Sequence, residues 1–173
     1  MISVATVECF THGKIGMILH KMAMGYEDVK DHPYYPIFNG NIYVVASMFL
    51  PQRDVIKNIL GIEIPPPDHP FKYAKVYREE RDLEVAYLMA KGLKEKLGCN
   101  ISIGTTAGVG RGGICILTDR SKYLFTTDIY GNVLTGENLI ERSEDGVSKT
   151  LEKLVEILHV EYKIKNNINN NKY

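Results

Sequence analysis

The chain has little of what marks several large protein classes. Its 173 residues contain no tryptophan and only three cysteines, and 21 basic side chains balance 21 acidic ones. Cys9, Cys99 and Cys115 are an odd number at wide spacings, so neither a disulfide framework nor a four-thiolate zinc site is indicated, and a reducing compartment is expected. Without net positive charge, the protein lacks the broad basic field on which nucleic-acid binding relies.

Long hydrophobic runs are missing as well. No apolar run approaches the roughly 18 residues of a membrane span, and the first residues lack the charged and apolar regions of a signal peptide. We therefore expect a cytoplasmic protein that binds neither membrane nor nucleic acid. A homodimer is expected only on the general ground that cyclic dimers are the commonest soluble assemblies.

Strand-like apolar runs alternate with helical patterns along the sequence. Strands are predicted at 2–7, 42–50, 101–103, 114–118 and 123–127, and helices at 14–25, 52–60, 78–97 and 147–160. This order predicts an α/β fold with a mainly parallel, mixed sheet flanked by helices, and with an antiparallel part around residues 114–127. The proline-rich segment 64–70 is expected to cross the surface.

The chain is long enough for one well-buried domain and short for two, so a single α/β domain is expected over residues 1–164. The segment 165–173 is rich in asparagine. It has too little apolar surface to offset the entropy lost on ordering, and we expect a mobile tail there.

Cys9 is the first candidate functional residue. It follows the strand at 2–7 and precedes the turn Thr11–Gly13 and a helix, where free N–H groups and the helix dipole stabilise a thiolate. His12 is placed to add a positive charge or to act as a base. The alternative is a buried cysteine that serves only the core.

A glycine-rich stretch, residues 104–113, is the second candidate. Gly104 and Gly108 are among its five glycines, and Thr105, Thr106 and Arg111 are further donors that suit a phosphate or carboxylate. The Walker ending is absent. The alternative is a hairpin that joins two strands. If the strands before Cys9 and Gly104 are parallel, both candidates lie at the carboxyl edge of the sheet, where α/β proteins bind ligands.

No metal site is predicted. The five histidines have no metal-ligand spacing, and Cys9 with His12 supplies only two ligands. Carboxylates distant in sequence can still meet around a magnesium ion, so that option stays open.

Residues 7–16 (VECFTHGKIG), residues 104–113 (GTTAGVGRGG) and the overall length together resemble the archaeal HcgF family. The resemblance covers residues 1 to about 160. Members of that family serve the biosynthesis of the iron-guanylylpyridinol (FeGP) cofactor of the methanogen Fe-hydrogenase. The resemblance thus implies a fold like that of nucleotide-processing α/β proteins and a role in assembling this cofactor, without a tightly bound cofactor of its own.

The resemblance also implies specific chemistry. The family binds guanylylpyridinol, whose carboxyl group is activated as an adenylate by the partner enzyme HcgE and then forms a thioester with the amino-terminal cysteine, here Cys9. Other FeGP-cofactor assembly proteins are further implied partners. On this view the N–H groups of Thr11 and Gly13 bind the oxyanion, and the residues of the glycine-rich stretch hold the guanylyl phosphate.

Two questions remain open at this level. One of the tyrosines Tyr26, Tyr34 and Tyr35 is a candidate to stack on the guanine. The glycine-rich stretch also resembles the Gly-Thr-Thr-Gly loop of the CinA carboxyl-terminal domain, although Ala107 replaces a glycine and Arg111 an expected proline. The alternatives are therefore a CinA-like nucleotide hydrolase or amidohydrolase, with Cys9 in the core, and a carrier that holds guanylylpyridinol without covalent chemistry.

Overall fold

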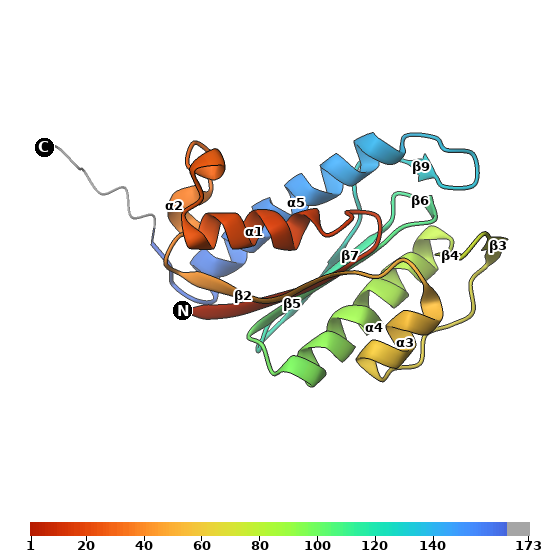
Figure 1. Cartoon of the computed structure of the whole chain (residues 1–173), viewed down its shortest axis with the longest axis horizontal. Coiled ribbons are helices and arrows are strands. Elements are labelled where there is room, and N and C mark those ends of the chain that lie inside the picture. The colour runs from red at the N-terminus through yellow and green to blue at the C-terminus, as the bar shows by residue number, and fades with distance from the viewer. Residues whose placement is uncertain (166–173) are drawn as a thin grey trace, which may run out of the picture.

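A five-stranded mixed sheet runs through the centre of the computed structural model, which describes residues 1–165 (Figure 1). The strand order is β2-β1-β5-β7-β8. The strands span Ile42–Phe49 (β2), Ile2–Glu8 (β1), Ile101–Thr106 (β5), Gly113–Leu117 (β7) and Lys122–Phe125 (β8). β1 pairs in parallel with β2 and β5, whereas β7 pairs antiparallel with β5 and β8. The predicted α/β class and the antiparallel part near 114–127 are confirmed.

Helices cover both faces of the sheet. Figure 1 shows α1 (Lys14–Met24), α2 (Tyr35–Phe38) and α5 (Leu139–Val160) on one face, and α3 (Arg53–Leu60) and α4 (Glu79–Leu97) on the other. A short 3-10 turn, η1 (Glu27–Val29), follows α1. One apolar core lies under α1 and α5 and a second lies under α3 and α4, so every side chain of β1 from Ser3 to Glu8 is buried. This explains why the strand reads as a continuous run without alternation.

Glycine and glutamine set the ends of the predicted helices. Gly25, Gly61 and Gly98 adopt the left-handed conformation that ends α1, α3 and α4. Gln52 caps α3 by accepting a hydrogen bond from the Val55 N–H. These helix ends match the expectations from sequence.

Four features differ from the predictions. β5 continues through Thr106, so the first residues of the glycine-rich stretch belong to a strand. The end of the proline-rich segment and the residues after it form a small hairpin, β3 (His69–Phe71) and β4 (Ala74–Val76). A second short pair joins β6 (Val109–Gly110) to β9 (Gly131–Asn132). α5 begins eight residues before the predicted start, at Leu139.

The described residues hold no helix that is long and apolar enough to cross a membrane. The predicted mobile tail lies, apart from Lys165, outside the described residues.

Candidate functional site

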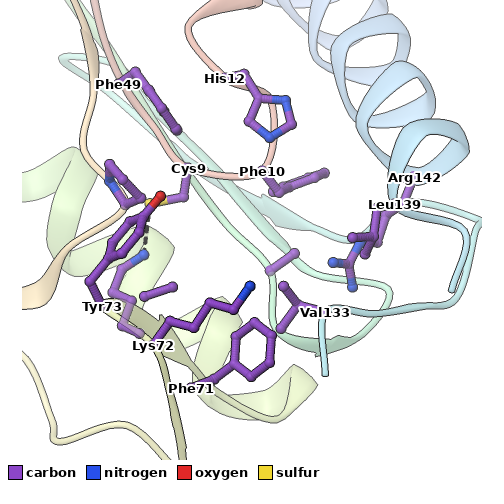
Figure 2. Close-up of a pocket in the computed structure, with 14 residues that line it drawn as sticks. Cys9, Phe10, His12, Phe49, Phe71, Lys72, Tyr73, Val133, Leu139 and Arg142 are labelled. Atoms are coloured by element: carbon purple, nitrogen blue, oxygen red, sulfur yellow. Dashed lines mark hydrogen bonds between the residues drawn. The ribbon is translucent and has the colours of Figure 1, made fainter. Parts of the chain in front are cut away.

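A cavity of about 300 Å³ opens at the carboxyl edge of the three parallel strands (Figure 2). Cys9 lies directly after β1, Phe49 ends β2 and Ala107 follows β5, and all three residues line the cavity. Because β1 and β5 are parallel, the expectation that their carboxyl ends share one edge is confirmed. The hairpin of β3 and β4 closes one side of the cavity with Phe71, Lys72, Tyr73 and Lys75.

Cys9 faces an amine that the sequence analysis missed. Its Sγ accepts a hydrogen bond from Nζ of Lys75 at 2.7 Å and lies 2.9 Å from the carbonyl oxygen of Leu50, to which the thiol donates. Cys9 is 8% exposed, and Lys75 is buried. Burial raises the pKa of the Cys9 thiol, and the positive charge of Lys75 opposes that rise. The thiol is therefore ordinarily protonated, with a cation in place to stabilise the thiolate.

Lys75 also connects Cys9 to a buried carboxyl group. Its Nζ donates to Oγ1 of Thr106 at 3.0 Å, and that hydroxyl donates to Oδ1 of Asp82 at 3.3 Å. Burial raises the pKa of Asp82 to about 7, although the hydrogen bond from the Gly108 N–H and the charge of Lys75 oppose it. The hydrogen bonds from Cys9 through Lys75 and Thr106 to Asp82 thus form a buried polar network. Its protonation can change near neutral pH.

The amino terminus of α1 does not serve Cys9 as the sequence analysis predicted. The buried carboxylate of Glu8 accepts hydrogen bonds from the N–H groups of Ile15 at 3.2 Å and Gly16 at 2.9 Å. It also accepts from the hydroxyls of Thr6 and Thr11. Burial raises the pKa of Glu8, and these hydrogen bonds oppose the rise. The helix end that was expected to stabilise a Cys9 thiolate is therefore occupied by its neighbour Glu8, and Lys75 supplies the positive charge instead.

His12 lies at the mouth of the cavity and its ring makes an edge-to-face contact with Phe49, with the ring centres 5.6 Å apart (Figure 2). Burial and then the nearby Lys14 charge lower the pKa of His12, which favours the neutral imidazole. Within residues 1–165, the Cys9 Sγ has Lys75, Leu50 and the Thr106 hydroxyl as polar neighbours, and no hydrogen bond joins this sulfur to His12. The role of His12 as a base stays a prediction.

Thr11 and Gly13 do not line the cavity. The Thr11 side chain is buried between Glu8 and Thr105, and Gly13 begins α1 at a φ of 76°. Their role in binding the oxyanion stays a prediction.

The glycine-rich stretch forms the connection between two antiparallel strands, which is the alternative that the sequence left open. Two of its loop N–H groups are used within the protein: Gly108 donates to Asp82, and Arg111 donates to Glu79. Thr105 and Thr106 are buried. The glycines permit close packing, since a Cβ on Gly104 would lie 2.3 Å from the Ala86 carbonyl oxygen of α4. The structure does not bring Gly104, Thr105, Thr106, Gly108 or Arg111 to the cavity wall, and their ligand contacts stay a prediction.

Other side chains line the cavity instead. Aromatic and aliphatic groups give it an apolar wall: Phe10, Phe49, Phe71, Tyr73, Val133 and Leu139. The candidate stacking residues Tyr26, Tyr34 and Tyr35 do not line this cavity, and stacking of one of them on the guanine stays a prediction. The cations are Lys72, Lys75 and Arg142. Lys72 and Lys75 stand between apolar residues and Arg142 between Glu141 and Ser143, and such local patterns are too common to identify a site.

The described part of the chain contains no group of three or more histidine, cysteine, aspartate or glutamate side chains arranged to hold a metal ion. The chemical groups that do converge are a thiol, an amine and a guanidinium around an apolar cavity. This set suits an organic acid or ester with an additional anionic group.

Comparisons with known proteins show the family to which the chain belongs. A model of the family described as "FeGP cofactor biosynthesis protein HcgF" matches residues 1–158. A UPF0254 protein of Methanococcus vannielii is 56% identical over 165 residues, covering 95% of this chain and 99% of that protein. A UPF0254 protein of Methanocaldococcus jannaschii is 52% identical over 169 residues, covering 94% and 99%.

Solved structures of other proteins share the fold. The competence or damage-inducible protein of Enterobacter asburiae superposes with a TM-score of 0.58 at 13% identity, covering 91% of this chain and 87% of that one. A CinA superfamily protein of Enterobacter cloacae gives a TM-score of 0.58 at 15% identity, covering 91% and 82%. At this level of identity the likeness concerns the fold alone.

Proposed function

The chain belongs to the HcgF family of FeGP cofactor biosynthesis proteins, and from that membership we propose that Cys9 accepts the acyl group of activated guanylylpyridinol. One observation carries the proposal. The Cys9 sulfur borders the cavity and lies 2.7 Å from the buried amine of Lys75, which is the arrangement that an acyl-accepting thiol needs.

The proposed step is an acyl transfer from oxygen to sulfur. The Cys9 thiolate attacks the carboxyl carbon of the acyl-adenylate, a carbon–sulfur bond forms, and the bond from that carbon to the phosphate oxygen of AMP breaks. AMP leaves with the electron pair, and the thiol proton passes to solvent. No oxidant or reductant is consumed. The product is a thioester, which keeps the acyl group activated for its later use as an iron ligand.

Lys75 acts on this step through Cys9. The thiol pKa is raised by burial, so the reactive thiolate forms only with help, and the Lys75 ammonium supplies it at hydrogen-bond distance. Thr106 and Asp82 hold the amine toward the sulfur. Lys75 is therefore a positioning residue whose loss lowers the fraction of thiolate.

The activated ligand comes from elsewhere in this proposal. An adenylating enzyme, HcgE, supplies the acyl-adenylate, and other FeGP-cofactor assembly proteins use the thioester. The cytoplasmic location and the homodimer stay predictions.

Intact-protein mass spectrometry tests the proposal. The protein is incubated with guanylylpyridinol, ATP and HcgE, and the wild type is compared with Cys9→Ala and with Cys99→Ala as a matched control. We expect a hydroxylamine-labile adduct of the ligand mass minus water on the wild type and the Cys99 variant only. Absence of the adduct while the adenylate forms would exclude Cys9 as the acyl acceptor.

Ligand binding and nucleotide turnover, measured on the same proteins, separate the alternatives. A non-covalent carrier would bind guanylylpyridinol equally well in the Cys9→Ala variant and give no adduct in any variant. A CinA-like hydrolase would turn over a nucleotide, and its activity would survive replacement of Cys9.

A further inference from the structure

We propose that Arg142 and Lys72 form an oxyanion subsite in the Cys9 cavity, which binds a phosphate ester of the acylating ligand. The inference rests on the proposed function in one respect: it takes this cavity as the place where the ligand binds. It assigns the anionic part of the ligand to residues that the sequence analysis did not select, and it leaves the glycine-rich stretch with a structural role.

Arg142 is a buried cation with unused hydrogen-bonding capacity. Its side chain lines the cavity and is 2% exposed. Nη1 donates to three carbonyl oxygens, those of Gly108, Gly110 and Gly131, at 2.8 to 3.0 Å. Nε is buried and has no hydrogen-bond partner among the described residues. A buried N–H group left unpaired is costly, so the guanidinium has unmet donor capacity.

The charge of Arg142 is not matched by an adjacent carboxylate. Arg53, Arg81 and Arg111 each pair with an aspartate or glutamate. Arg142 makes no such ion pair within residues 1–165: its hydrogen bonds go to carbonyl oxygens, and the buried Asp82 carboxyl acts on it without direct contact. A buried charge without a directly bonded counter-ion is expensive, and a bound anion would supply that bond.

The position of Arg142 at the start of a helix increases the positive electrostatic potential in the cavity. Arg142 lies in the first turn of the 22-residue helix α5, where the helix dipole already favours negative charge and disfavours a cation. The helix has no side-chain cap, and its first residue, Leu139, lines the same cavity. A buried guanidinium and the first residue of this helix therefore both line one cavity, and the charge and the helix dipole both favour an anion near them.

Packing holds the guanidinium in this orientation. A Cβ on Gly131 would lie 2.9 Å from Nε and Cζ of Arg142, so only glycine lets this backbone lie so close. The guanidinium carbon also lies 5.8 Å from the centre of the Phe10 ring, another residue of the cavity wall. Arg142 is thus fixed before any ligand arrives, which reduces the entropy lost on binding.

Lys72, in the β3–β4 hairpin, supplies a second positive charge to the cavity that Arg142 enters from α5. It is exposed at the tip of the β3–β4 hairpin with a φ of 52°, and its described contact is with the ring of Phe71. In Figure 2, Lys72 extends toward the space beside Val133, while Arg142 approaches from α5 and Cys9 lies on the far side. A ligand with its acyl carbon at Cys9 therefore places an attached phosphate ester between Lys72 and Arg142.

Calorimetry with two ligands tests this assignment. Guanylylpyridinol and the same pyridinol without its guanylyl phosphate are titrated into the wild type, Lys72→Ala and Arg142→Met. Arg111→Ala is the matched control, because Arg111 is a paired arginine outside the cavity. We expect Lys72→Ala to weaken guanylylpyridinol binding about fivefold and Arg142→Met at least about tenfold. Binding of the pyridinol without phosphate is expected to change less than about twofold.

Several outcomes would overturn the subsite. Unchanged guanylylpyridinol binding in Lys72→Ala would do so even if Arg142→Met fails to fold. Equal weakening of both ligands would assign the two cations to another part of the ligand. A loss of affinity in Arg111→Ala would indicate that the glycine-rich stretch binds the phosphate.

Inorganic phosphate separates failure of the subsite from failure of the proposed function. If the wild type binds neither pyridinol ligand, the proposed function is wrong, and thermal melting in phosphate against chloride at equal ionic strength still tests the subsite. We expect phosphate to stabilise the wild type more than Lys72→Ala. Equal stabilisation of both proteins would overturn the subsite.

Discussion

Nζ of Lys75 lies 2.7 Å from Sγ of Cys9, although the two residues are 66 positions apart in the sequence. The contact forms because Lys75, in β4 of the β3–β4 hairpin, lies beside Cys9, which directly follows β1. It determines the expected reactivity of the only thiol that lines the cavity, since Cys99 and Cys115 are buried elsewhere.

Replacing Lys75 should slow the alkylation of Cys9. Burial already raises the thiol pKa and Lys75 opposes it, so Lys75→Met should lower the thiolate fraction and the rate with iodoacetamide at pH 8 about tenfold. Peptide mass spectrometry measures the alkylation rate of each cysteine. Lys91→Met, at an exposed lysine of α4, is the control. Equal rates in all three proteins would mean that Lys75 does not influence the sulfur.

Asp82 should make the folded protein less stable as the pH rises. Its pKa is raised to about 7 in the folded state from an ordinary value of 3.8, so the folded state binds more protons between these values. The free energy of unfolding therefore falls between pH 4 and 7.

Urea unfolding of the wild type and Asp82→Asn at pH 5 and 7.5 measures this contribution by difference. Other groups that titrate in this range, such as His12 and His32, are common to both proteins and cancel. We expect the wild type to lose more stability than Asp82→Asn on going to pH 7.5. The same loss in both proteins would contradict the raised pKa.

Glu8→Gln should destabilise the fold. The Glu8 carboxylate accepts four hydrogen bonds, and an amide nitrogen in place of one oxygen would face donors. We expect a loss of about 2 kcal/mol in the free energy of unfolding. Glu84→Gln, on an exposed position of α4, should change it by less than about 0.5 kcal/mol. A similarly small effect at Glu8 would show that the helix end does not depend on this carboxylate.

Gly104→Ala should cost stability because β5 and α4 are in close contact. The added Cβ would lie 2.3 Å from the Ala86 carbonyl oxygen and 2.9 Å from the Ala90 nitrogen, so the helix must shift. We expect a loss of about 2 kcal/mol or more by chemical denaturation. Gly40→Ala has open space at a φ of 73° and should cost only about 1 kcal/mol of backbone strain. A smaller loss at position 104 than at 40 would refute the packing role.

Helices and strands were predictable wherever apolar residues recurred at a regular spacing and a glycine or proline ended the segment. α4 carries apolar residues at helical spacing before Gly98, and both of its ends were predicted within one residue. The start of α5 was missed for a specific reason. Its buried positions there hold Arg142, Ser143 and Gly146, which interrupt the apolar period although the helix continues.

The sequence by itself determined the α/β class, the family resemblance and the location of Cys9 at the end of the first strand. These features depend on local order along the chain: an apolar run, a turn and then a helical period. The partners of Cys9 were decided by the tertiary structure alone. Glu8 occupies the α1 terminus, Lys75 approaches the sulfur from a distant hairpin, and Arg142 reaches the cavity from α5. Single charged residues carry no periodic signal, and only folding determines which of them lose water and meet.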